Sequence, residues 1–197
     1  MLENFTLFFI TALTALAVEN TVFARGLGLN KWGLFINGPK TGILYGMLLT
    51  WLLTVSSVFA AGINYIMQDS PYIMYLRAPL YFICVSGVYI GTYMLAGVKS
   101  MRYTRAMKQA LPGCAFSSAL FGTLYVTSGS RNFFEITGYA LGAGIGYTLA
   151  ILIIYYARKR LAISPVSRSF RGLPILLMYI GLLSLALYGL IGHGLPT

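Results

Sequence analysis

The sequence carries little charge, and negative charge is the scarcest. Charged residues make up 9% of the 197 residues, with 14 Lys and Arg but only four Asp and Glu, whereas apolar residues make up 58%. A soluble domain normally carries about a quarter of its residues as charged side chains. With a mean hydropathy of +0.77, the chain lacks a water-facing surface. We therefore predict an all-α integral membrane protein.

Cysteine, histidine and catalytic motifs are scarce as well. The two cysteines, Cys84 and Cys114, lie in separate apolar stretches, which argues against a disulfide framework. The only histidine, His193, follows the last apolar run, where we expect a membrane-interface residue. No phosphate-binding loop, H-E-x-x-H or G-x-S-x-G is present, which excludes a self-contained ATPase or hydrolase. The first apolar run has no preceding basic segment and no small-residue cleavage site, so we interpret it as retained.

Six apolar runs approach the length of a transmembrane helix, which needs about 20 residues. They cover residues 5–24, 41–66, 76–98, 110–127, 134–157 and 173–191. Three spans carry the chain to the far side of the membrane, so a second set of three starts from the opposite face. Residues 1–98 and 105–197 can therefore form inverted repeats within a single domain.

The basic residues predict the orientation. The connections after the first, third and fifth runs contain every Lys and Arg except Arg77 and Arg131. The positive-inside rule places these three connections in the cytoplasm and both termini outside. The same rule explains the net charge of +10 without a nucleic-acid partner.

Glu19 and Asn20 interrupt the first run. A carboxylate inside the bilayer costs at least about 2.5 kcal/mol, so it must face the bundle, water or a partner. One interpretation is an ion or proton site; the other is a structural hydrogen bond to Asn20, Thr21 or a neighbouring helix. Arg25 does not have the i, i+4 spacing of a helical ion pair with Glu19, so we interpret it as an interface residue.

Glycine and proline interrupt the first and fourth runs. Gly26 and Gly28 follow the polar pair, and Pro112 and Gly113 stand near the start of the fourth run. Proline removes a backbone donor and glycine permits unusual backbone angles, so we predict that both helices are broken. Cys114 follows directly, and we expect its thiol at a helix end, where an N-terminus would favour the metal-binding thiolate. The alternative for this segment is a small-residue packing surface.

Small residues also recur in the fifth run. Gly138, Gly142 and Gly146 are spaced every four residues and share one helix face. Such a stripe lets another helix approach closely. It predicts helix packing, either within the chain or in a dimer.

Four segments together resemble a known family. They are 19-ENTVFARGLGL-29, 111-LPGCAFSSALFG-122, 141-LGAGIGYTLAI-151 and 170-FRGLPI-175, in this order. They are similar to the six-span membrane proteins of the Rnf and Na⁺-NQR electron-transport complexes, above all to the A subunit of Rnf and the E subunit of NQR. The resemblance implies two sister subunits of opposite orientation in the cytoplasmic (inner) membrane of a bacterium or archaeon. Each has an inverted three-plus-three repeat with broken first and fourth helices, and the pair shares a [2Fe-2S] cluster. It also implies electron transfer coupled to Na⁺ or H⁺ export.

The implied cluster ligands are where this sequence departs from the family. The second family cysteine corresponds to Cys114, but the first corresponds to Asn30, which Lys31 follows. Asparagine is a poor ligand for iron, since clusters are held by cysteine thiolates. Two hypotheses remain: an electron-transport subunit with an altered cluster site, and a diverged non-redox paralogue. The paralogue would be a small transporter or an assembly protein, as a homodimer, with Glu19 and Asn20 near its ligand.

Overall fold

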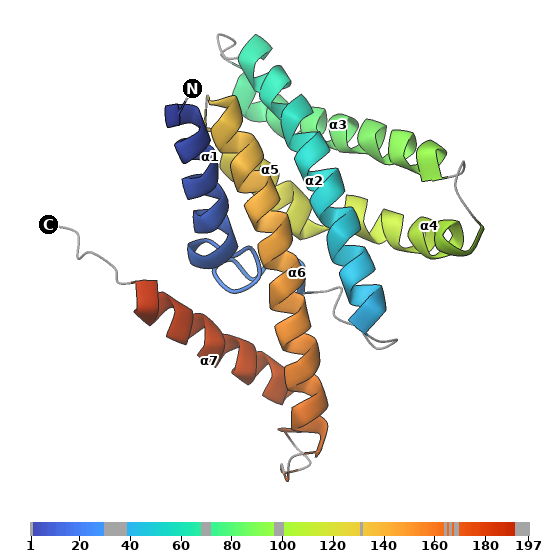
Figure 1. Cartoon of the computed structure of the whole chain (residues 1–197), viewed down its shortest axis with the longest axis vertical. Coiled ribbons are helices and arrows are strands. Elements are labelled where there is room, and N and C mark those ends of the chain that lie inside the picture. The colour runs from blue at the N-terminus through green and yellow to red at the C-terminus, as the bar shows by residue number, and fades with distance from the viewer. Residues whose placement is uncertain are drawn as a thin grey trace, which may run out of the picture.

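The computed structural model describes residues 2–29, 39–67, 72–96, 101–130, 132–163, 165, 167 and 170–191. Within these ranges the regular structure is helical, and no strand is found. The elements are α1 (Leu2–Leu13), η1 (a π-helix, Thr14–Val18), α2 (Pro39–Met67), α3 (Ile73–Ala96), α4 (Met101–Ala115), α5 (Ser118–Thr127), α6 (Phe133–Ile163) and α7 (Leu173–Ile191). Figure 1 shows their arrangement.

Among the described residues, three helices are long and apolar enough to cross a membrane, namely α2, α3 and α6. The consecutive helices α4 and α5 make a fourth candidate when they are counted as one span, bent by 47°. The first and last apolar helices, Asn4–Val18 and Leu173–Gly189, are shorter. Each element lies within or around one of the six predicted runs. The first run differs, because its helix ends at Val18 and does not continue to residue 24.

The two longest helices, α2 and α6, form the centre of the bundle and run antiparallel (Figure 1). A Cβ atom added to Gly46 of α2 would collide with Thr148 of α6. One added to Gly144 of α6 would collide with Thr50 of α2. From Gly46 to Thr50 the residue number rises along α2, while that of the contacting residue falls from Thr148 to Gly144 along α6, so the two helices are antiparallel. Glycine at both crossings is what lets the two backbones approach.

The glycine stripe of α6 packs against α1, which runs parallel to it. Added Cβ atoms at Gly138 and Gly142 would collide with the backbones of Phe8 and Ala12, respectively. One at Gly146 would press on the backbone of Leu16 in η1. The structure thus places this stripe inside the chain, at the contact that holds the first span to the core.

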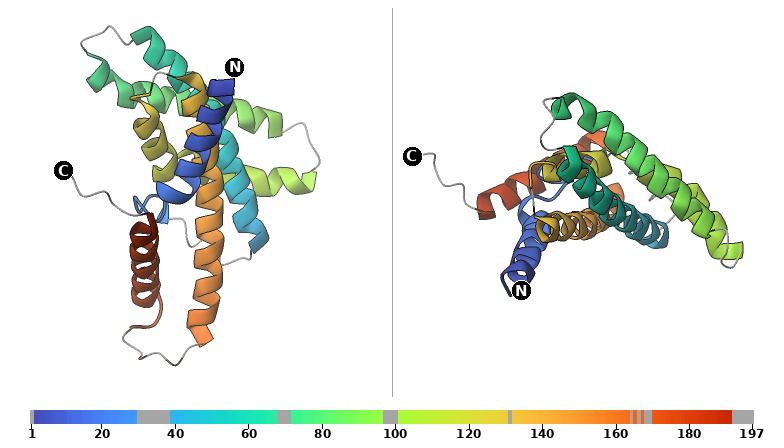
Figure 2. Two further views of the ribbon diagram at one scale, coloured as in Figure 1. Left: turned by 60° about the vertical axis from the view of Figure 1, so that its left-hand side comes forward. Right: turned by 90° about the horizontal axis from the view of Figure 1, so that it is seen from above.

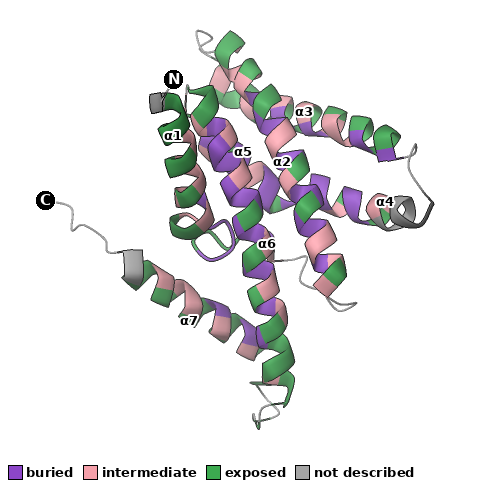
Figure 3. Cartoon of the chain, in the orientation of Figure 1, coloured by how far each residue is buried: buried purple, intermediate pink, exposed green. Residues whose placement is uncertain are grey.

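The remaining helices form the periphery. α3 packs on α2 and α4, and α7 contacts α6 and η1 (Figure 2). Buried residues concentrate on α2, α5 and α6, whereas α3 and α7 are mostly exposed or half-buried (Figure 3). Their exposed side chains are apolar, for example Ile83, Met94 and Leu182. An apolar exterior of this kind suits a lipid environment.

Candidate functional site

The first span stops being a helix where its polar pair begins. The π-helix ends at Val18, and the Glu19 N–H donates to the Thr14 carbonyl at 2.8 Å. A single turn over residues 21–25 follows and ends at Gly26, which has a φ of +66°. The Gly26 N–H donates to the Val22 carbonyl at 2.9 Å, which is the αL helix-ending motif that glycine allows. Gly26 therefore ends this turn within the interrupted first span, where the sequence predicts a glycine-associated helix break.

Asn20 holds this turn in place. Its side-chain oxygen accepts hydrogen bonds from the N–H groups of Val22 at 3.0 Å and Phe23 at 3.4 Å, as an N-cap residue does. Its side-chain nitrogen donates to the carbonyls of Leu16 and Gly146, each at 3.0 Å. Asn20 is 5% exposed, and these bonds use both ends of its amide. Asn20 is therefore a structural clamp between the turn and α6.

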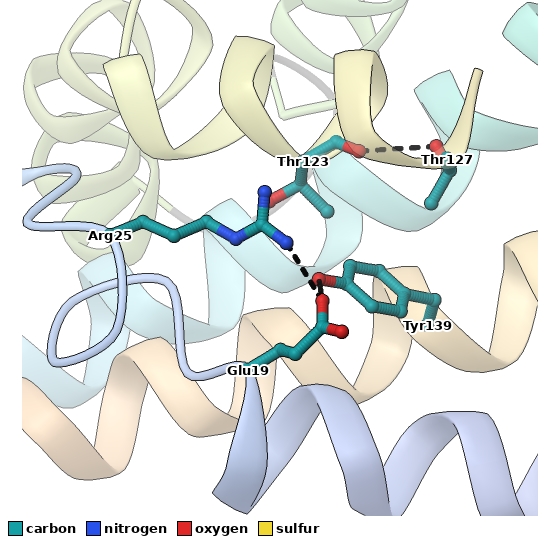
Figure 4. Close-up of polar contacts among 5 residues, drawn as sticks. All are labelled: Glu19, Arg25, Thr123, Thr127 and Tyr139. Atoms are coloured by element: carbon teal, nitrogen blue, oxygen red, sulfur yellow. Dashed lines mark hydrogen bonds and ion pairs between the residues drawn. The ribbon is translucent and has the colours of Figure 1, made fainter. Parts of the chain in front are cut away.

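Glu19 is held by two donors from different parts of the chain (Figure 4). Its Oε2 atom accepts hydrogen bonds from Arg25 Nη2 and from the Tyr139 hydroxyl of α6, each at 2.7 Å. The expectation from helical spacing that Arg25 and Glu19 do not pair is wrong. The reason is that the helix ends before Glu19, so the spacing rule does not apply to this segment. The other carboxylate oxygen accepts no hydrogen bond from the described residues.

A cavity of about 660 Å³ borders this ion pair, between the broken segment and α7. Its lining residues are Ala17, Val18, Glu19, Asn20, Phe23, Ala24, Arg25, Ser184, Leu185, Leu187 and Tyr188. The Ser184 hydroxyl of α7 donates to the Phe23 carbonyl at 2.7 Å, which ties α7 to the turn. The side chains of Glu19 and Arg25 are 42% and 34% exposed. The carboxylate is thus accessible to an ion from the cavity.

The second interruption separates α4 from α5. Ser117 has extended backbone angles and accepts a hydrogen bond from the Ala119 N–H at 3.3 Å, which caps α5. Pro112 and Gly113, which we predicted to break the helix, lie inside α4 instead. The break follows them at Phe116 and Ser117 because the Ser117 side chain supplies the cap that starts the next helix.

The two interruptions meet in the core. The Gly28 N–H donates to the Ser118 hydroxyl at 3.0 Å, and the Gly28 carbonyl accepts from the Tyr147 hydroxyl at 3.2 Å. The Tyr45 hydroxyl of α2 donates to the Gly113 carbonyl at 2.7 Å. Gly28 has a φ of +79°, and a Cβ there would collide with Tyr147. Backbone groups freed by one break are thus satisfied by the other break and by tyrosines of the central helices.

Cys114 lies in this core and is 0% exposed. It stands at the helix end that we predicted, but in the last turn of α4, at a C-terminus. The favourable dipole of a helix N-terminus is therefore absent, since a C-terminus carries partial negative charge. Its thiol donates to the Tyr45 carbonyl at 3.5 Å. Cys84 lies on α3 with its sulfur 4.0 Å from the Ser56 carbonyl.

These surroundings do not fit a cluster shared between two sister proteins. Such a cluster must lie at the surface of this chain, but Cys114 is enclosed and bonded to α2. Within the described ranges, no three His, Cys, Asp or Glu residues gather as metal ligands would. Asn30, Lys31 and His193 lie outside the described residues.

Three residues of this region, Tyr139, Tyr147 and Tyr45, were not predicted from the sequence. Tyr139 and Tyr147 directly follow Gly138 and Gly146 of the stripe on α6. A tyrosine among small residues was the sequence signal that could have identified these two side chains. Their partners come from distant segments, so no local spacing revealed them. Glu135, in the first turn of α6, accepts a hydrogen bond from Ser130 at 3.0 Å.

Residues 8–193 match the Rnf-Nqr subunit family of membrane proteins. The chain belongs to this family. It is 30% identical over 193 residues to the A subunit of the ion-translocating oxidoreductase complex of Yersinia pseudotuberculosis serotype O:1b, covering 98% of both chains. It is 29% identical over 192 residues to the protein of the same name from Pectobacterium carotovorum, covering 97% of this chain and 98% of the relative. It is 27% identical over 188 residues to the A subunit of the Na(+)-translocating ferredoxin:NAD(+) oxidoreductase complex of Acetobacterium woodii, covering 95% of this chain and 97% of the relative.

Proposed function

We propose that this Rnf-Nqr family chain is a membrane component of an ion-translocating oxidoreductase complex, which couples electron transfer to Na⁺ or H⁺ export. The observation that carries the proposal is the family match over residues 8–193, together with relatives of this name aligned over nearly their whole length. The apolar helical bundle supports it. The relatives are named as subunits of such complexes, so we propose that this chain also works within a larger assembly.

The proposed topology has six spans, with both termini outside and the basic connections in the cytoplasm. The helix contacts support an inverted repeat of residues 1–98 and 105–197, because several contacts between helices of one half have counterparts in the other. α1 packs on α6 as α4 packs on α2, and α3 packs on α2 as α7 packs on α6. α3 also contacts α4 as α7 contacts η1. Inverted repeats with broken leading helices are a common transporter architecture.

The proposed partner is a sister six-span protein of opposite orientation, with other subunits of the complex around the pair. The cytoplasmic (inner) membrane of a bacterium or archaeon is the proposed location. The enclosed position of Cys114 argues that this chain is not an equal contributor of cluster ligands. If a [2Fe-2S] cluster lies at the interface of the pair, we propose that its ligands come from the partner, because Cys114, which corresponds to a family ligand position, is enclosed in this chain. No step of the proposal depends on that cluster.

The ion-handling group that we propose is Glu19. Its carboxylate faces a cavity of about 660 Å³ and keeps one oxygen without a donor from the described residues. Arg25 neutralises the charge while Tyr139 fixes its orientation. A cation that enters the cavity would compete with Arg25 for the carboxylate. The ion pair with Arg25 offsets the cost of placing an acidic side chain within the membrane-spanning bundle.

The first experiment is an anaerobic purification of the tagged full chain, with every protein that co-purifies. We expect partner proteins that carry flavin or iron, and we expect the iron and acid-labile sulfide to persist in Cys114→Ala. Loss of iron in that variant would show that Cys114 is a ligand and would overturn our account of its enclosed position. Recovery of the chain with no redox-active partner would overturn the proposed function.

The second experiment tests Glu19 by ²²Na⁺ uptake into inverted membrane vesicles, driven by reduced ferredoxin and NAD⁺. Those substrates are the ones in the name of the Acetobacterium woodii relative. We expect Glu19→Gln to lower ion uptake more than electron transfer, because the carboxylate is removed but the fold is kept. Glu135→Gln is the matched control, since Glu135 lies at the start of α6 and binds Ser130. Equal uptake in both variants would remove Glu19 from the ion path.

A second candidate function is a non-redox paralogue that acts as a small transporter or assembly protein, as a homodimer. The observation that favours it is Asn30 at the position of the first family cysteine. In this case the Glu19 cavity would hold a solute, and the purified chain would carry neither iron nor flavin partners. The purification above separates the two functions.

A further inference from the structure

A second cavity lies at one end of the bundle, where α2 ends and α3 and α6 begin. Its volume is about 460 Å³. The lining residues are Val58, Ala61, Gly62, Asn64, Tyr65, Ile73, Arg77, Ser128, Gly129, Ser130, Phe133 and Ile136. None of them lines the Glu19 cavity. This cavity is therefore a separate feature, which the proposed ion path does not use.

Arg77 is the one charged residue among those that line this cavity. Its Nη1 atom donates to the Ser128 hydroxyl at 3.2 Å, whereas its Nε atom is buried and has no hydrogen-bond partner. It makes no ion pair with any acidic side chain that the structure describes, and Glu135 is bonded to Ser130 instead. A guanidinium has five N–H donors, so Arg77 keeps capacity for an anionic ligand.

The polar groups around Arg77 are complementary to an anion. Asn64 accepts a hydrogen bond from the Tyr81 hydroxyl at 2.9 Å, so its amide nitrogen is the group left to donate. The cavity also borders the N-terminus of α6 at Phe133, which carries partial positive charge. The Ser130 hydroxyl also lies in the lining, but it already donates to Glu135, so it is not among the donors left for an anion. Positive charge and hydrogen-bond donors thus converge without a carboxylate in the lining.

The other wall of the cavity is apolar, formed by Val58, Ala61, Ile73, Phe133 and Ile136. The cavity therefore offers a charged group beside a hydrocarbon surface, at the level where the spans end.

Nearby tyrosines support a position at the membrane interface. Tyr65, Tyr72 and Tyr75 are 76%, 67% and 82% exposed at this end of the bundle. Tyrosines are enriched where a membrane meets water.

We propose that this cavity binds the phosphate of an anionic membrane lipid, with Arg77 as the pairing group. The apolar wall would contact the start of an acyl chain, which favours a lipid over free phosphate. Arginine is well suited to phosphate because its planar fork makes paired charge-assisted hydrogen bonds.

Native mass spectrometry of the full chain, purified with its co-purifying partners, tests this proposal. Phosphatidylglycerol is titrated against a neutral glycosyl diacylglycerol with the same acyl chains. We expect selective retention of phosphatidylglycerol, and about tenfold weaker binding in Arg77→Gln, from the loss of a charge-assisted hydrogen bond. The matched control, Arg160→Gln, removes an exposed arginine at the far end of α6 and should bind as the unmodified chain does.

A second variant tests the cavity without touching Arg77. Gly62 lines the cavity, and a Cβ there would meet no atom of another helix within 4 Å, so Gly62→Leu adds a bulky side chain at an open position of the lining. Gly87→Leu is the control, because Gly87 is a helical glycine with equally open space outside the cavity. We expect Gly62→Leu to reduce phosphatidylglycerol retention and Gly87→Leu to leave it unchanged.

Three results would overturn the proposal. One is equal retention of the neutral glycolipid, and another is unchanged binding in folded Arg77→Gln and Gly62→Leu. The third is full displacement of the lipid by millimolar inorganic phosphate, which would assign the site to a free anion.

Discussion

Replacing Asn20 by alanine tests the central claim about the first interruption. The variant removes the cap on the N–H groups of Val22 and Phe23 and the bond to the Gly146 carbonyl. Loss of an N-cap costs about 1 kcal/mol. An interhelical hydrogen bond in a membrane protein contributes about 0.6 kcal/mol, and up to about 1.7 kcal/mol. We therefore expect Asn20→Ala to lower the free energy of unfolding by about 2 kcal/mol.

The assay is thermal unfolding of the detergent-solubilised protein, with hydrogen exchange measured by mass spectrometry. A loss of this size lowers the melting temperature of a chain of this length by about 4–8 °C. The amides of Val22 and Phe23 should exchange faster, because their acceptor is removed. Asn20→Ser retains a capping oxygen and loses the amide bonds to the Leu16 and Gly146 carbonyls, so we expect about half of the effect.

Asn64→Ala is the matched control, since the structure gives the Asn64 side chain one hydrogen bond, from Tyr81. We expect a smaller loss there and no change in exchange at residues 21–25. If Asn20→Ala unfolds at the temperature of the unmodified protein, the claim that Asn20 clamps the turn to α6 is refuted. If Asn20→Ser and Asn20→Ala are equally destabilised, the link to α6 matters and the cap does not.

Three glycine substitutions give further predictions, each measured by melting temperature and yield of folded protein. Gly142→Leu should abolish assembly, because its side chain would enter the backbone of Ala12, and an unchanged yield would contradict the α1–α6 contact. Gly28→Ala should destabilise by at least about 1 kcal/mol, since φ is +79° and Tyr147 occupies the space; a neutral result would show that the loop is not held there. Gly87→Ala should be neutral or stabilising by up to about 1 kcal/mol, because the site is open and helical, and a large loss would reveal a contact at that face.

The sequence was sufficient to predict the helices because hydrophobic length is a local property. Every predicted run corresponds to helical structure, and the boundaries of α2 and α7 fall close to the predicted ones. The stripe at Gly138, Gly142 and Gly146 was also readable from spacing alone, and the structure shows which helix it contacts. Its partner could not be predicted, since α1 is one of several apolar helices that fit a glycine groove.

The sequence predictions were wrong where rules for residues within a helix were applied to segments in which the helix has ended or continues unexpectedly. Helical spacing argued against the Glu19–Arg25 pair, but the turn after Val18 folds Arg25 back onto the carboxylate. Pro112 suggested a break at its own position, but a proline can lie within a membrane helix when neighbouring groups satisfy the freed carbonyls. The break came at Ser117 instead, where a side chain caps the next helix.

The contacts between the two interruptions explain why each is tolerated. A break inside a bilayer exposes N–H and carbonyl groups that lipid cannot satisfy. Gly28 gives its N–H to Ser118 and its carbonyl to Tyr147, while Gly113 gives its carbonyl to Tyr45. Because each partner lies in another span, neither break is stable alone, and the first and second halves of the chain must fold together. A half-chain ending at residue 98 should therefore fail to form the ordered turn at residues 21–25. Co-expression with the second half should restore it, as hydrogen exchange at those amides would show, and an ordered turn in the isolated half would refute the mutual dependence.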